Sequence, residues 1–145
     1  MSKRCYCLCY FLLGLSVSSC AELPKTTHLT VSGLTFHNTT SSPIKNARLT
    51  VHKTHGTVVC GFILPYKECS TTFPQRQYQG NAITVSWQQS GRSWTATDVA
   101  VKLPDYPIPN RSTIALISLG ENGSISARLI QPASGTPGSL SLQPK

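Results

Sequence analysis

Apolar and polar side chains alternate with a period of two along most of the chain between residues 28 and 130. Such alternation is typical of β-strands that have one buried face. The first run covers residues 28–37, and its apolar positions change face near Gly33, so we expect a β-bulge at that glycine. A turn at 38–43 leads to a second strand. Its inward-facing side chains are Ala47, Leu49 and Val51.

The clearest hairpin is predicted around the Ser90–Gly91 pair, because the alternating strand before it reverses there. A two-residue turn at this position places Trp87 opposite Trp94, so the two tryptophans of the chain form one cross-strand pair. The apolar positions that follow have the opposite parity from Trp94. This change of parity predicts a bulge near Asp98.

A last hairpin is predicted from the apolar runs at 114–119 and 125–130, which flank the turn at 120–123. The chain thus contains about eight short strands, with turn residues roughly every 8 to 12 positions. No helix-length periodic segment follows the N-terminal region. The pattern predicts an all-β fold, a small Greek-key sandwich of about 7–8 strands.

Residues 28–130 resemble the immunoglobulin-like and fibronectin type III-like modules of bacterial envelope proteins. The resemblance rests on residues 35–39, on the Pro43-Ile44 pair and on the strand at 47–51. It implies an immunoglobulin-like sandwich. A transthyretin-like sandwich, as in the lipoprotein of type VI secretion systems, has the same size and is a second interpretation.

The N-terminus has the layout of a secretory signal. Lys3 and Arg4 precede an apolar run of 13 residues at 5–17, which is too short to span a membrane, since a spanning helix needs about 20 apolar residues. Val17-Ser18-Ser19-Cys20 resembles the lipobox of bacterial lipoproteins, although the commonest version has leucine where this chain has Val17. The resemblance implies cleavage before Cys20 and attachment of diacylglycerol to its sulfur.

The lipoprotein interpretation also predicts where the protein resides. In that family, a residue other than Asp after the modified cysteine directs transfer to the outer membrane, and here the residue is Ala21. We therefore expect a signal peptide at 1–19, a lipidated tether at 20–27, a sandwich at 28–130 that faces the periplasm, and a disordered Pro/Gly/Ser-rich tail at 131–145. Ordinary cleavage after Ala21 is the alternative, and it would give a secreted, soluble protein.

Two cysteines remain once the signal and Cys20 are set aside, namely Cys60 and Cys69. An even remainder in an exported chain predicts a disulfide. We expect residues 58–62 and 68–73 to form a hairpin around 63–67, with the two sulfurs facing each other across it. A loop this short gains about 2 to 3 kcal/mol in the chain-entropy model and would staple a local element. The eight intervening residues do not match the C-x-x-C spacing of redox enzymes.

Charge and chemistry exclude several functions. The chain from Cys20 carries 11 basic and 5 acidic side chains, a net charge of +6, and the basic residues are scattered rather than clustered as in a nucleic-acid-binding face. The five carboxylates form no pair suited to acid–base catalysis, and no nucleotide, cofactor or hydrolase motif is present. His37, His52 and His55 lack the spacing and co-ligands of a metal site. We expect no enzyme activity, no cofactor and no metal.

A binding or structural role is left. The first hypothesis is a lipid-anchored adaptor of the cell envelope that offers its sandwich surface or a strand edge to a protein partner. The second is a carbohydrate-binding module that uses Trp87, Trp94 or Tyr66 as an exposed aromatic platform. For the two tryptophans, a pair in the sandwich core is the competing interpretation. An accessory lipoprotein of a secretion system is a further alternative.

Overall fold

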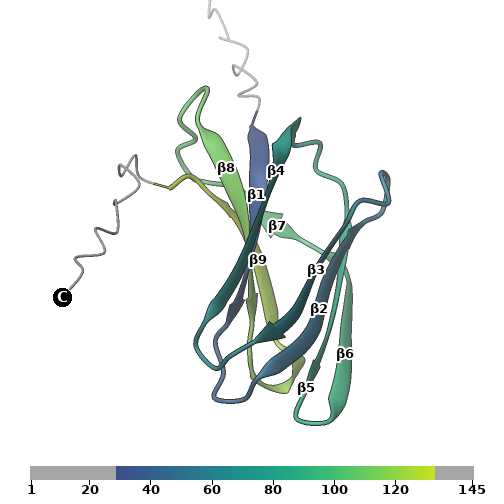
Figure 1. Cartoon of the computed structure of the whole chain (residues 1–145). Helices are drawn as coiled ribbons and strands as arrows, with labels where there is room; N and C mark the ends of the chain where they lie inside the picture. The colour runs from purple at the N-terminus through teal and green to yellow at the C-terminus, as the bar shows by residue number, and fades with distance from the viewer. Residues whose placement is uncertain (1–28, 133–145) are drawn as a thin grey trace, which may run out of the picture.

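The computed structural model of the chain describes residues 29–132 and shows a two-layered β-sandwich (Figure 1). The predicted signal, Cys20, the tether through residue 28 and the tail from residue 133 lie outside the described residues. The strands are β1 (Thr30–Asn38), β2 (Ile44–Val51), β3 (Thr57–Ile63), β4 (Glu68–Gln77), β5 (Ile83–Gln89), β6 (Arg92–Val99), β7 (Val101–Lys102), β8 (Ser112–Leu119) and β9 (Ile125–Ile130). A single 3-10 turn, η1 (Glu121–Gly123), joins the last two strands.

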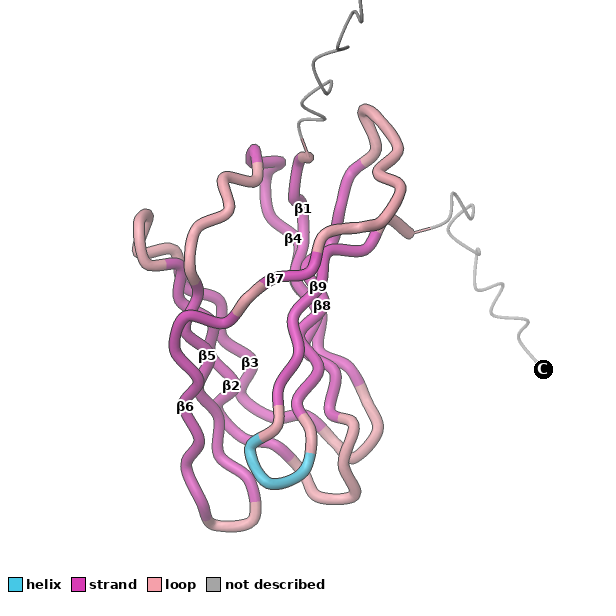
Figure 2. The backbone as a smooth tube through the Cα atoms, turned by 180° about the vertical axis from the view of Figure 1, so that it is seen from behind, coloured by secondary structure: helices cyan, strands magenta, loops and turns pink. Residues whose placement is uncertain are grey.

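The nine strands form two sheets. One has the order β4-β1-β8-β9-β7 and the other the order β3-β2-β5-β6. Neighbours are antiparallel except for the pairs β1–β8 and β7–β9, which are parallel. The chain passes from the second sheet to the first between β6 and β7, as Figure 2 shows. The prediction of an all-β sandwich is confirmed.

The two ends of the sandwich differ. We call the end formed by the turns at 39–43, 64–67, 90–91 and 120–124 the closed end. The opposite end, which we call the open end, carries the connections at 52–56, 78–82 and 103–111. The described chain both enters and leaves at the open end (Figure 1).

The core lies between the sheets and takes side chains from both. Trp87, Phe36, Ile44 and Ile117 are each at most 2% exposed. Trp87 pairs with Trp94 across the β5–β6 hairpin, and its turn has positive φ at Ser90 and Gly91, so the predicted register is confirmed. Trp94 is half-buried and packs against the core.

The predicted bulges are also confirmed. The register of β1 shifts between Val31 and Gly33 against both of its neighbours. Asp98 has a φ of 51° at the point where the β5–β6 register shifts. A third irregularity, at Asn46 in β2, has a φ of 52° and was not expected from the hydrophobic pattern.

The disulfide is confirmed, but the hairpin around it was a wrong prediction. Cys60 and Cys69 are bonded, with their Cα atoms 6.4 Å apart. However, β3 pairs with β2 in one sheet and β4 pairs with β1 in the other, so the bond cross-links the two sheets instead of stapling one hairpin. The cause is tertiary: β3 and β4 each pair with a strand of a different sheet, and the turn at 64–67 carries the chain between the layers.

Asn38 holds this inter-sheet turn in place. Its side chain is fully buried, and Nδ2 donates to the carbonyl oxygens of Ser42, Ile63 and Leu64 at 2.8, 3.3 and 3.1 Å. Its Oδ1 accepts from the backbone N–H and the hydroxyl of Thr40 at 3.0 and 2.7 Å. One amide therefore ties the β1–β2 turn to the β3–β4 turn, and together with the disulfide it fixes the closed end.

Candidate functional site

The four edge strands differ in how they resist pairing with another chain. β4 carries Pro74, which has no N–H to donate, and β7 is only two residues long. β6 is bulged at Asp98. By contrast, β3 is seven residues long and contains neither proline nor a charged side chain. Among the described strands, β3 is the edge without such protection.

Large apolar side chains are exposed along β3 and the turn that follows it. Val59 and Phe62 of β3 are 51% and 52% exposed, and the turn adds Leu64 and Tyr66. This surface, which we call the β3 edge, is defined by these four residues. Exposed apolar side chains on an unprotected edge strand are the features that favour addition of a further strand.

Basic side chains flank the β3 edge. Arg48 of β2 lies opposite Val59, and Lys45 lies opposite Phe62. Both are exposed, and neither forms an ion pair with a described residue. An added strand would therefore meet apolar side chains and unneutralised positive charge on the same face.

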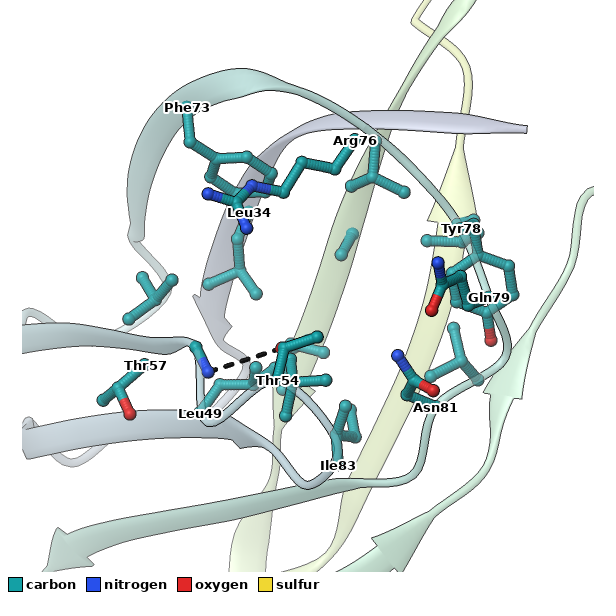
Figure 3. A pocket seen from close by; sticks show the side chains of 18 of the residues that line it. Leu34, Leu49, Thr54, Thr57, Phe73, Arg76, Tyr78, Gln79, Asn81 and Ile83 are labelled. Carbon is teal, nitrogen blue, oxygen red and sulfur yellow. Dashed lines mark hydrogen bonds between the residues drawn. The ribbon is translucent and has the colours of Figure 1, made fainter. Parts of the chain in front are cut away.

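A cleft of about 580 Å³ opens between the sheets toward the open end (Figure 3). Its floor is the top of the core, where Leu34, Ile83 and Leu129 are buried. Half-buried side chains form its walls. The wall residues are Val31, Val51, Val58, Phe73, Val101 and Ala115. The volume falls within the range of about 300–1,000 Å³ that is usual for small-molecule sites.

The margin of the cleft is polar. Arg76 is the charged side chain among the lining residues, and Figure 3 shows it running toward Phe73 and Leu34. Tyr78 and Asn81, from the 78–82 connection, stand on another margin. Burial raises the pKa of the Tyr78 phenol above its ordinary value of 10.0. At neutral pH the hydroxyl is in its neutral form, as any tyrosine hydroxyl is at that pH, and can donate a hydrogen bond.

The structure does not bring together Trp87, Trp94 and Tyr66, the residues of the aromatic platform considered for carbohydrate binding. Trp87 is 2% exposed and belongs to the core. Trp94 lies on β6, with its ring so close to Gly123 that a Cβ there would fall 2.2 Å from a ring carbon. Tyr66 is exposed, but it follows β3, at the opposite edge of the same sheet from β6. The three side chains therefore share no surface.

His37, His52 and His55 are neither among the four residues of the β3 edge nor among those that line the cleft. Nε2 of His52 is 2.6 Å from the hydroxyl of Thr84, and Nδ1 is 3.6 Å from a carboxylate oxygen of Asp98. Within residues 29–132, no group of three or more His, Cys, Asp or Glu side chains is placed to hold a metal ion. No helix in that same range is long and apolar enough to cross a membrane.

Comparisons with known proteins leave this chain without a family assignment. No family model matches it, and no curated protein matches it. The solved structures give a match to an NMR structure of a protein from Eubacterium rectale, with 14% identity over 76% of this chain and 93% of that chain. Its TM-score is 0.40, so the match carries no argument.

The sequence suggested a strand edge as a binding surface without showing which strand provides it, and it did not suggest the cleft. The sequence contains one clue to the β3 edge, because residues 57–63 include no charged residue and no proline, but only the strand order shows that this strand lies at an edge. For the cleft, the sequence contains no such clue. The lining residues of the cleft come from eight strands and from the connections at the open end, and their apolar character had been explained by the core alone.

Proposed function

We propose that this protein is a lipid-anchored, non-catalytic adaptor of the cell envelope and that its β3 edge receives an extended segment of a partner protein. The observation that carries the proposal is the contrast between edges. β4, β6 and β7 each have a feature that opposes strand pairing, whereas β3 has none and exposes Val59 and Phe62 beside its free backbone groups.

The chemistry of the edge describes the partner segment. Strand addition uses main-chain hydrogen bonds for affinity and alternate side chains for specificity. Apolar side chains would pack on Val59 and Phe62, and acidic ones would lie near Arg48 and Lys45, one strand away. Pairing with a second copy of the chain would gain no such attraction, because both copies carry the same basic side chains.

The proposed lipid anchor on Cys20 affects which end of the sandwich lies nearer the membrane. Leu29 lies at the open end, where its carbonyl accepts from the N–H of Tyr78 at 2.8 Å. Cys20 is nine residues earlier, which spans at most about 30 Å of extended chain. The 103–111 connection at the same end exposes Tyr106 to 91%. With the lipid on Cys20, the open end is the end nearer the bilayer, and Phe62 and Tyr66 lie near the closed end, farther from it.

Charge introduced on β3 tests the adaptor role. Val59→Lys places a positive charge on the exposed face of the edge strand, beside Arg48, without removing a core side chain. Thr95→Lys is the matched control, since Thr95 is exposed on the protected edge strand β6. In native gels of detergent-solubilised envelopes, Val59→Lys should abolish a complex that Thr95→Lys preserves. A complex that survives Val59→Lys would rule out the β3 edge.

The lipid anchor has a separate test. A Cys20→Ala variant should leave the membrane fraction, and the intact mass of the parental protein should exceed that of the chain from Cys20 by a diacylglycerol and any further acyl chain. A Cys20→Ala variant that still partitions with membranes would overturn the anchor and leave the β3 edge to its own test.

A further inference from the structure

We propose that the cleft between the sheets is a binding site for an anionic amphiphile with a single aliphatic chain, of the long-chain fatty acid type. The carboxylate would bind Arg76 at the margin, and the chain would lie on the apolar floor. This site differs from the β3 edge: it uses side chains that point between the sheets, whereas strand addition uses the outward backbone groups of β3.

The apolar part of the cleft suits a chain and not a compact polar molecule. Its floor and walls carry aliphatic or aromatic side chains from both sheets, with Phe73 of β4 on one side and Ile83 of β5 on another. In Figure 3 these side chains surround one continuous space between the labelled residues. Polar lining groups lie at the 52–56 turn and the first residue of β3, at the end of β4 and at the 78–82 connection.

The positive charge of Arg76 favours an anionic head group on the ligand. Arg76 is the one charged residue among those that line the cleft, and no described carboxylate lies within ion-pair distance of it. An arginine fork binds a carboxylate through two parallel hydrogen bonds. The neutral phenol of Tyr78 and the amide of Asn81 add donors on another margin of the cleft. A cationic head group would be repelled, and a neutral one would lose the ion pair.

The position of the cleft fits a ligand that comes from a membrane. It opens toward the same end of the sandwich as Leu29, the residue that leads back to Cys20. The closed end is cross-linked by the Cys60–Cys69 disulfide and by Asn38, so the sheets are held together there. The apolar mouth is thus presented at the end to which a membrane-derived amphiphile would have the shortest path.

A displacement series tests this proposal on the mature chain, residues 20–145, with Cys20→Ser. The neutral fluorescent probe N-phenylnaphthylamine is bound first, and octanoate, decanoate, laurate and dodecanol are then titrated against it. Each added methylene should tighten binding about fourfold. Arg76→Gln should weaken laurate about fivefold and leave dodecanol unchanged. Arg128→Gln, on the outer face of β9, is the matched control and should change neither.

Each outcome of the displacement series either supports or overturns the proposed binding site in the cleft. Displacement that strengthens with chain length and depends on Arg76 only for the acids supports the site. Probe binding in which Arg76→Gln affects laurate and dodecanol equally would overturn the assignment of the head group. A chain that binds neither probe nor acid, including one whose own terminal segments fill the cleft, would overturn the proposal. None of these results bears on the β3 edge.

Discussion

Replacing Asn38 with alanine removes the amide that joins the β1–β2 turn to the β3–β4 turn. The carboxamide has two N–H donors and one oxygen, and it contacts three carbonyls and two donors of Thr40. Because two hydrogens cannot serve three acceptors fully, about four effective hydrogen bonds are lost. At about 1 kcal/mol each, the free energy of unfolding should fall by about 3–5 kcal/mol.

Urea unfolding followed by tryptophan fluorescence measures this loss, since Trp87 is buried in the core. Gln88→Ala is a suitable control, because Gln88 is exposed and accepts a single bond from Asn46 at 3.3 Å. It should change stability by less than about 0.5 kcal/mol. A loss below about 1 kcal/mol for Asn38→Ala would refute the reasoning, because it would mean that the turn carbonyls are satisfied without this side chain.

Three further predictions concern stability. Removing the disulfide with Cys60→Ala and Cys69→Ala should lower the free energy of unfolding by about 2.7 kcal/mol for a ten-residue loop, and an unchanged urea midpoint would contradict this. Gly123→Ala should lower the melting temperature more than Gly80→Ala does: both glycines have positive φ, but only at Gly123 would the Cβ strike the Trp94 ring, so equal shifts would argue against that contact. Because the pKa of Tyr78 is raised on folding, its stabilising contribution should be complete below pH 10 and should decline as the pH rises through the folded-state pKa. Tyr78→Phe should flatten that alkaline decline in a pH series of melts, and an unaltered slope would refute it.

The local features of the fold followed from the sequence because local rules determine them. The Trp87–Trp94 register depends only on a two-residue turn and on the alternation of side chains. The bulges at Gly33 and Asp98 could be predicted because the apolar positions switch between odd and even residues there, and such a switch within a strand requires an extra residue.

Features of the fold that depend on which strands become neighbours could not be predicted from the sequence. The loop between Cys60 and Cys69 is short enough for a hairpin, and it is equally compatible with a change of sheet, so the spacing could not distinguish the two. The partners of β3 and β4 decide the matter: β3 pairs with β2, the strand just before it, and β4 pairs with β1, from which β2 and β3 separate it in the chain.

The candidate sites could not be predicted from the sequence either, because they too depend on which strands become neighbours. The absence of charge in β3 has meaning only once β3 is known to be an edge. Arg76 looked like one of several scattered basic residues until the structure placed it at the margin of an apolar cleft. Tyr66 is exposed, but Trp87 and Trp94, which the carbohydrate-binding hypothesis grouped with it, lie elsewhere, because one is core and the other packs on Gly123.

Site-specific photo-crosslinking in intact envelopes tests the adaptor role most directly. A photoreactive amino acid at Val59 of β3 should give a discrete adduct with a second protein, and the same residue at Thr95 of β6 should give none. Adducts of equal yield at both positions, or an adduct at Val59 with twice the mass of this chain, would contradict the proposal that β3 pairs with a partner strand.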